Sequence, residues 1–311
     1  MKSLYNKLSL FVLSLLMVST FVACNNDDEV VGPVETPKTI VDVAVSDPQF
    51  SILVAALTKA DLVSTLKSAG PFTVFAPTND AFTALFAQLG VSGIDQLSAE
   101  ALKPILLNHV LTSKVPSSAI ATGYVATANT SGPNKSAVKA FVQLGSSVMV
   151  DGSKVVKADV MASNGIIHVI DKVILPASVV SHAINNPNFS ILVQAVVKAN
   201  LVEALSGTGP FTVFAPTNAA FNALFATLGV SGISDLSAET LTPILLYHVV
   251  SGNVLASQVS SGNVPTLKEG SSLNVMVNGS GVKINNASNV VATDVQGSNG
   301  VIHAIDAVLL P

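Results

Sequence analysis

The sequence predicts an α+β chain built from two similar domains in tandem. Three observations support this prediction. A ten-residue block, Gly70 to Asn79, returns letter for letter as Gly209 to Asn218, which indicates a duplication. Each copy places a β-type run before a segment with helical spacing, and further short β-type runs follow the first copy. The length of 311 residues suits two domains of ordinary size better than one core.

The first residues have the organisation of an export signal. Lys2 and Lys7 precede the apolar run from Leu8 to Val22, and Ala23 precedes Cys24, the single cysteine. The segment Phe21 to Cys24 resembles the lipobox of bacterial lipoproteins. We therefore expect residues 1–23 to be a lipoprotein signal peptide and Cys24 to be lipidated, forming a membrane anchor. The plainer alternative is a secretory leader that is cut nearby.

Residues 24–38 read as a flexible acidic tether. Polar and acidic residues follow Cys24 directly, and two prolines interrupt the remainder. The acidic cluster resembles the surface-export signal of some Gram-negative lipoproteins, and an ordinary solvated linker is the alternative. We expect an outer-membrane lipoprotein of the bacterial cell envelope, exposed at the surface.

The repeated block predicts a strand, a corner and a helix. Phe72 to Phe75 is an aromatic and β-branched run, and Pro77 cannot continue a ladder of hydrogen bonds. Thr78 or Asn79 can cap the helix that follows. That helix has the apolar spacing i, i+3, i+4, i+7, and a glycine suits its end. The residues concerned are Phe82, Leu85, Phe86, Leu89 and Gly90.

This block resembles the first signature of the fasciclin-like (FAS1) domain family, at Phe72 to Phe82 and again at Phe211 to Phe221. The resemblance implies two tandem FAS1 domains, each a β-sandwich-like core of about seven strands with several packed helices. It also implies adhesion or extracellular interaction without catalysis. The signature positions are Phe72, Phe75, Pro77, Thr78 and Asn79, repeated as Phe211, Phe214, Pro216, Thr217 and Asn218.

The first domain is expected to span residues 39–176. A helix is predicted from Asp47–Pro48, with an apolar stripe reaching Leu66, and another opens at Ser98. Later β-type runs cover 141–144, 148–150 and 155–156, and a long central strand is expected from Asn164–Gly165 to Pro176. The second domain, residues 178–311, repeats this order. A stretch of differing length, 124–140 against 263–272, is predicted to be a loop in both copies.

Four histidines fall at equivalent positions in the two copies: His109 with His248, and His168 with His303. A metal site would be indicated by His-x-His or His-x-x-x-His spacing or by an available cysteine. The sequence has neither spacing, and its one cysteine, Cys24, is assigned to the N-terminal anchor. We expect each ring to be hydrogen-bonded within its own domain. The pairs Asn164–Gly165 and Asn299–Gly300 are expected to set turns. His182, opposite Val43 in the repeat, is expected at the surface.

Tyr247–His248 matches a second family signature, whereas Asn108–His109 departs from it. The resemblance places this signature near segments proposed for receptor contact in animal adhesion proteins. Apolar periodicity instead favours a buried helix.

Composition and motifs exclude several function classes. All 15 basic residues are lysines, tryptophan is absent and the net charge is −4, which argues against nucleic-acid binding. No nucleophile elbow, phosphate-binding loop or carboxylate pair is found, so no enzyme, cofactor or metal is expected. We expect the partner to be an extracellular protein or a polysaccharide. A small-ligand capture lipoprotein and an unrecognised hydrolase are the alternatives.

Overall fold

The computed structural model describes residues 37–279 and 281–311. The predicted signal peptide, Cys24 and most of the tether lie outside the described residues. Residues 37–311 form a compact unit of their own, and all the hydrophobic cores described below lie within it.

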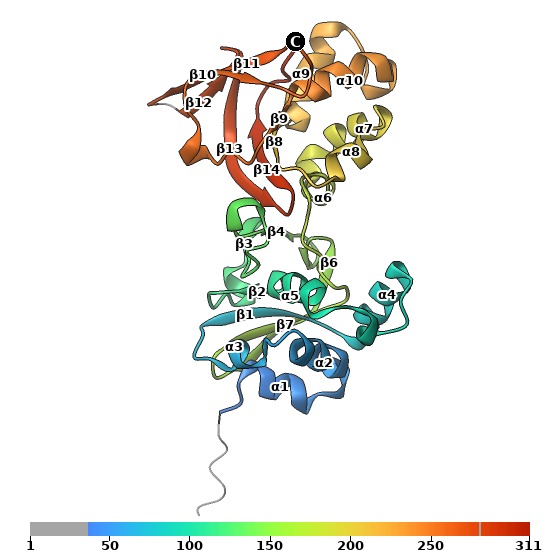
Figure 1. Ribbon diagram of the computed structural model, residues 1–311, viewed down its shortest axis with the longest axis vertical. Helices are drawn as coiled ribbons and strands as arrows, with labels where there is room; N and C mark the ends of the chain where they lie inside the picture. Colours follow the sequence, from blue (N-terminus) through green and yellow to red (C-terminus); the bar gives the residue numbers. More distant parts are fainter. Residues whose placement is uncertain (1–36, 280) are drawn as a thin grey trace, which may run out of the picture. The chain divides into compact units, whose positions relative to one another are not determined.

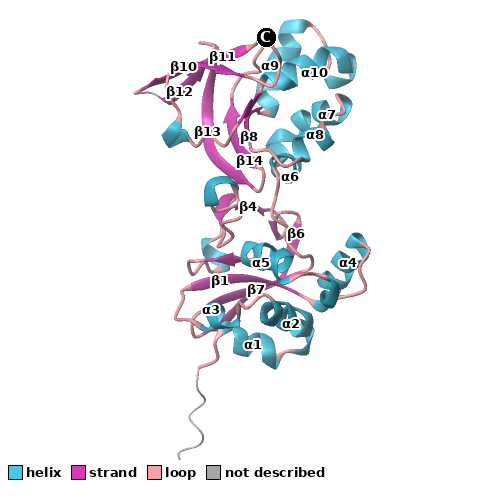
Figure 2. Cartoon of the chain, in the orientation of Figure 1, coloured by secondary structure: helices cyan, strands magenta, loops and turns pink. Residues whose placement is uncertain are grey.

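Within the described residues each domain combines helices with a seven-stranded sheet, which confirms the predicted fold class (Figures 1 and 2). In the first domain the helices are α1 (Ile40–Ser46), α2 (Ser51–Lys59), α3 (Val63–Lys67), α4 (Asn79–Leu89) and α5 (Ala99–Asn108). Its strands are β1 (Phe72–Pro77), β2 (Val110–Leu111), β3 (Gly123–Ala126), β4 (Lys139–Leu144), β5 (Val148–Val150), β6 (Ser153–Ala162) and β7 (Gly165–Ile170).

The second domain repeats these elements in the same order. Its helices are α6 (Val179–Asn185), α7 (Ser190–Lys198), α8 (Val202–Ser206), α9 (Asn218–Leu228) and α10 (Ala238–Tyr247). Its strands are β8 (Phe211–Pro216), β9 (Val249–Ser251), β10 (Gly262–Pro265), β11 (Ser272–Asn278), β12 (Gly281–Ile284), β13 (Ser288–Gly297) and β14 (Gly300–Ile305).

The strand order is the same in both domains. It runs β2-β1-β7-β6-β5-β4-β3 in the first and β9-β8-β14-β13-β12-β11-β10 in the second. The signature strand β1 pairs in parallel with β7, Phe72 opposite Gly165 and Pro77 opposite Ile170. All other strand pairs of the first domain are antiparallel. The long strand β6 changes register twice against β7. Such bulges bend a strand and increase its twist, which curls the sheet toward a barrel.

The curled sheet gives each domain two cores. In the first domain Val74 and Ile167 pack with the helices, whereas Phe75 and Ile170 pack with Val142 inside the curl. Strand side chains alternate between faces, so β1 and β7 serve both cores at once.

The signature helix agrees with the sequence-based expectation at both ends. The Thr78 side chain accepts a hydrogen bond from the amide of Ala81, and Gly90 ends the helix with a left-handed φ of 68°. Phe82 and Phe86 are buried, but Leu89 is exposed. The predicted apolar stripe was therefore wrong at its last position, because α4 extends beyond the core there.

Two helices were not predicted, and two further expectations were wrong. Helices α1 and α6 were missed, because seven residues are too few to show a helical period. The strand β7 ends at Ile170, since Asp171 turns back and accepts a hydrogen bond from the Lys154 amide at 2.7 Å. The variable stretch is not all loop, because its ends pair as strands: β3 with β4, and β10 with β11.

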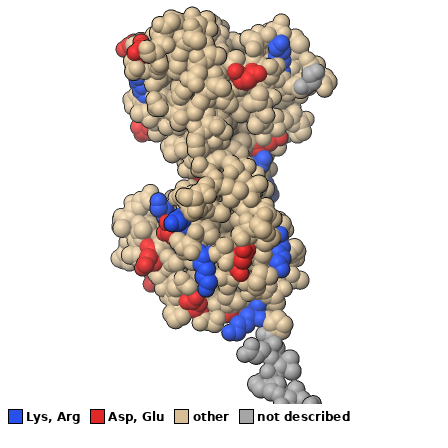
Figure 3. All heavy atoms as spheres, turned by 180° about the vertical axis from the view of Figure 1, so that it is seen from behind, with Lys and Arg blue, Asp and Glu red and all other residues tan. Residues whose placement is uncertain are grey.

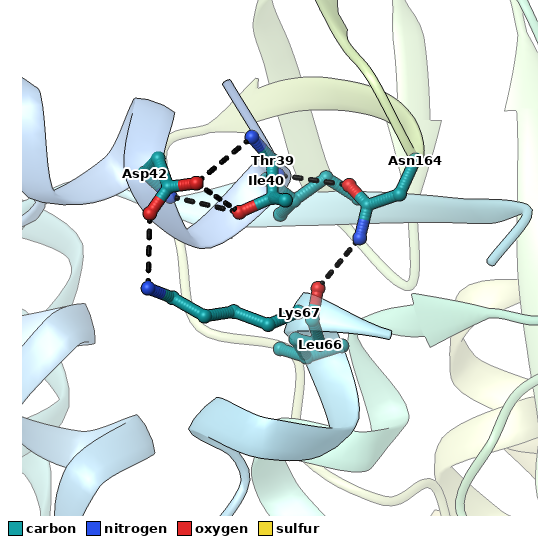
Figure 4. A network of polar contacts seen from close by, with 6 residues as sticks. All are labelled: Thr39, Ile40, Asp42, Leu66, Lys67 and Asn164. Carbon is teal, nitrogen blue, oxygen red and sulfur yellow. Dashed lines mark hydrogen bonds and ion pairs between the residues drawn. The ribbon is translucent and has the colours of Figure 1, made fainter. Parts of the chain in front are cut away.

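A single buried amide joins distant parts of the first domain (Figure 4). The Asn164 side chain accepts a hydrogen bond from the Ile40 amide at 2.9 Å and donates to the carbonyls of Leu66 and Ser68, each at 2.8 Å. It thereby fixes the start of α1 and the end of α3 to the β6–β7 turn. Asn299 makes the same three contacts in the second domain, with Val179, Leu205 and Gly207.

The start of α1 carries a second set of contacts beside this amide. Thr39 and Asp42 form a capping box, and Asp42 pairs with Lys67 at 3.0 Å (Figure 4). Hydrogen bonds from Thr39 and the neighbouring Lys67 lower the pKa of Asp42 to about 2.

Gly165, the residue after the buried asparagine, has no room for a side chain. A Cβ there would lie 2.1 Å from the Phe72 carbonyl oxygen.

Replacing Asn164 by alanine should destabilise the protein strongly. Three backbone groups would lose their partner, two of them in buried hydrogen bonds, and each buried loss costs about 1–3 kcal/mol. We expect a loss of at least about 2 kcal/mol in the free energy of unfolding, measured by urea denaturation. The control is Asn188→Ala at an exposed asparagine, which should change stability by about 0.5 kcal/mol or less. Equal midpoints for the two variants would contradict the assignment.

Candidate functional site

The signature asparagines hold the helices together. The Asn79 side chain accepts a hydrogen bond from the Ile52 amide at 3.0 Å and donates to the Pro48 carbonyl at 2.9 Å. It thereby fixes the start of α4 to the start of α2. Asn218 makes the equivalent contacts with Ile191 and Pro187. The signature asparagines therefore form hydrogen bonds with backbone groups of their own domain.

The first pair of equivalent histidines is fully engaged by backbone groups. His109 donates from Nδ1 to the Ile105 carbonyl at 2.8 Å and accepts at Nε2 from the Ile174 amide at 2.8 Å. His248 does the same with Ile244 and Leu309, at 2.7 and 2.9 Å. These bonds need the neutral ring with its proton on Nδ1. Neither ring nitrogen remains available to a metal or a substrate.

The second pair of equivalent histidines, His168 and His303, contacts the bulged strands β6 and β13. His168 contacts the Val115 carbonyl through Nε2 at 2.9 Å, and its Nδ1 accepts from the Asp159 amide at 3.3 Å. His303 makes the matching contacts with Val254 and Asp294. Each ring also stacks on a signature phenylalanine, Phe75 or Phe214. The two pairs of histidines therefore have different backbone partners and do not form a common site.

His182 is not at the surface, contrary to the sequence-based expectation. Its ring is completely buried, and Nε2 contacts the Gln296 carbonyl of β13 at 3.1 Å. The error followed from missing α6, because this helix packs His182 against the sheet. Val43 opposite it in the repeat is an apolar residue, which was an available signal that the position faces inward.

Tyr247 and His248 both lie in the core, 6% and 2% exposed. The Tyr247 hydroxyl donates to the Ser272 carbonyl at 3.1 Å and accepts from Asn285 at 2.8 Å. In the first domain Asn108 takes this place and contacts Thr127 and Asn129 of the variable stretch. The buried-helix interpretation of this segment therefore agrees with the structure, and neither side chain is presented to a partner.

Charge is thinly spread over the surface. On the face shown in Figure 3, acidic and basic side chains lie singly or in small groups, separated by uncharged surface. Among residues 37–279 and 281–311, no group of three or more His, Cys, Asp or Glu side chains is placed to hold a metal ion. In the same part of the chain no single helix meets the length and hydropathy of a membrane span, although the bent pair 40–46 and 48–59 does so jointly.

Burial of the histidines should make stability depend on pH. Burial lowers the pKa of His109, His182 and His248 to about 4, from an ordinary value of 6.5. The unfolded chain then binds more protons than the folded chain between about pH 4 and 6.5, so stability falls as the pH falls through this window. Burial raises the pKa of Asp151 to about 6, which acts in the opposite direction.

Between pH 7 and pH 4.5 each of the three histidines lowers the free energy of unfolding by about 2 kcal/mol, and Asp151 offsets about 2 kcal/mol of this sum. We therefore expect the free energy of unfolding to drop by about 5 kcal/mol over this range. Urea denaturation across this range measures it. Asp151→Asn keeps an acceptor oxygen and removes the opposing titration, so its decline should be steeper. A stability that is constant or rises toward pH 4.5 would refute the prediction.

Comparison with known proteins gives a consistent result. The fasciclin domain model matches residues 48–176 and again residues 187–311. Protein sll1483 of Synechocystis sp. is 51% identical over 134 residues, which cover 43% of this chain and 73% of that protein. Transforming growth factor-beta-induced protein ig-h3 of Sus scrofa is 30% identical over 251 residues, which cover 79% of this chain but 35% of that protein.

Among solved structures, the FAS1 domain pair of the insect cell adhesion molecule fasciclin I aligns with a TM-score of 0.47 and 21% identity. The alignment covers 87% of this chain and 96% of that chain. The family model alone accounts for most of the sequence, in two successive matches. The chain therefore belongs to the fasciclin domain family and carries two copies of the domain.

Proposed function

We propose that this protein is a surface-tethered adhesion or interaction protein, which binds an extracellular protein or a polysaccharide through loops of its two domains and catalyses no reaction. The observation that carries the proposal is that the polar residues at equivalent positions of the two domains form hydrogen bonds within their own domain. The signature asparagines and four histidines all satisfy backbone groups of their own domain. Family membership supports the same role, since fasciclin-domain proteins include adhesion proteins.

The loops within the variable stretch are suited to recognition because they are held in place. In the first domain Thr127 donates to the Val138 carbonyl at 2.7 Å, closing the base of the loop. The loop tip, Asn134 and Lys135, is exposed. In the second domain Lys268 donates to Ser271 at 2.9 Å across a shorter loop. A loop fixed before binding loses less conformational entropy when a partner arrives.

Binding through the first loop can be tested with residues 37–311 on an array of extracellular matrix proteins and polysaccharides. We expect saturable binding to at least one component. Lys135→Ala at the loop tip should weaken it several-fold, because one charged contact contributes on the order of 1 kcal/mol. Lys114→Ala, at another exposed lysine, is the matched control and should bind as the parent does. Conversion of an array component to product, or no binding at all, would refute the proposal.

We further propose that lipid on Cys24 anchors the protein in the bacterial outer membrane, at the cell surface. The sequence of residues 21–24 supports this part of the proposal. Cys24→Ser should abolish incorporation of radiolabelled fatty acid and release the protein from membranes. A seryl variant that is labelled like the parent would remove the lipoprotein assignment and leave the loop-binding proposal standing.

Small-ligand capture is retained as a second candidate because the second domain has an apolar cavity, described next. The described residues offer no observation in favour of a hydrolase.

A further inference from the structure

The second domain contains an apolar cavity between its first three helices and its sheet. The cavity has a volume of about 120 Å³. Its lining comes from α6, α7, α8, α10, β8, β9 and β14, and includes Val179, Leu192, Val196, Leu205, Val213 and Ile302. Close packing leaves few voids of this size in protein interiors. A void that a domain retains here therefore requires an explanation.

The first domain supplies an internal control. The equivalent space there measures about 20 Å³. Two lining positions account for part of the difference, because Ile40 and Leu57 occupy the places of Val179 and Val196. All four side chains are buried, and each first-domain residue is one methylene larger. The equivalent space is thus nearly filled by side chains in the first domain and open in the second.

The cavity can accept hydrocarbon only. His248 is the one lining residue with a polar side chain, and both of its ring nitrogens are hydrogen-bonded to backbone groups, at 2.7 and 2.9 Å. A water molecule needs several polar partners, and apolar cavities of about 150 Å³ remain dry and bind molecules such as benzene. The size and lining of this cavity fall in that class.

The apolar lining continues to the surface. Ile184, Val197 and Val202 belong to it and are 59%, 60% and 37% exposed. The filled space of the first domain does not extend to the equivalent residues, one of which is the polar Thr58. We propose that the second domain binds the end of an alkyl chain, with the terminal carbons in the cavity and the following carbons along this exposed rim. The proposal goes beyond adhesion and does not depend on it.

The test is methyl NMR on residues 37–311, labelled at Ile, Leu and Val, with three probes. Decanoate supplies a free alkyl chain, benzene fills the cavity without reaching the rim, and phosphatidylcholine vesicles supply the same chemistry from a membrane. We expect decanoate to give saturable shifts at the methyls of Val196 and Ile302. Vesicles that perturb the same methyls when decanoate does not would assign a membrane source. Benzene binding without either alkyl source would overturn the proposal, as would no binding.

A reciprocal exchange of residues provides the controls. Val179→Ile with Val196→Leu places the first-domain residues in the cavity and should weaken decanoate binding by roughly tenfold or more. Its folding is checked by an unchanged or raised Tm. Ile40→Val with Leu57→Val opens the equivalent space and should create a second set of shifting methyls, at Ile167. Undiminished binding by the filled variant would overturn the proposal even if the first-domain variant failed to fold.

Discussion

The three hydrogen bonds of the buried asparagine connect parts of the fold that are far apart in the sequence. In the first domain they join the start of α1, the end of α3 and the turn before β7. The helices involved have seven and five residues, and isolated helices of this length are not stable in water. They depend on tertiary contacts, and the asparagine supplies those contacts where the chain enters and leaves the helical layer. The same arrangement recurs at Asn299.

The rest of each domain is organised around the strand that follows this turn. β7 and β14 pair in parallel with the signature strands and contribute one face to each of two cores. The histidines along them form hydrogen bonds with backbone carbonyls and amides, so these polar residues, which recur between the copies, stabilise the domain. The two copies differ in three other places. The variable stretch is longer in the first domain, Asn108 stands where the second domain has Tyr247, and the apolar cavity is open only in the second domain. These differences are where the two domains can acquire separate functions.

The sequence predicted the elements that have strong local signals. The strand and helix around Thr78, the glycine at the helix end and the helix that begins after Ser98 all carry cap residues and regular apolar spacing. It did not predict α1 and α6, whose seven residues show no period, and so it misplaced His182. It also could not show that β7 ends at Ile170, because Asp171 is held by a residue on another strand. The cavity depends in part on two methylene groups that Ile40 and Leu57 have and that Val179 and Val196 lack. This difference became visible only when the folded copies were compared.

Native-state hydrogen exchange at the Ile40 amide tests the central role of the asparagine most directly. This amide donates to the Asn164 side chain near the start of the domain, a place where chains often fray. If the asparagine fixes α1 to the core, the Ile40 amide should exchange only through global unfolding, with the same free energy as the Ile167 amide of β7. The account would be contradicted if the free energy of opening at the Ile40 amide were several kcal/mol lower than that at the Ile167 amide.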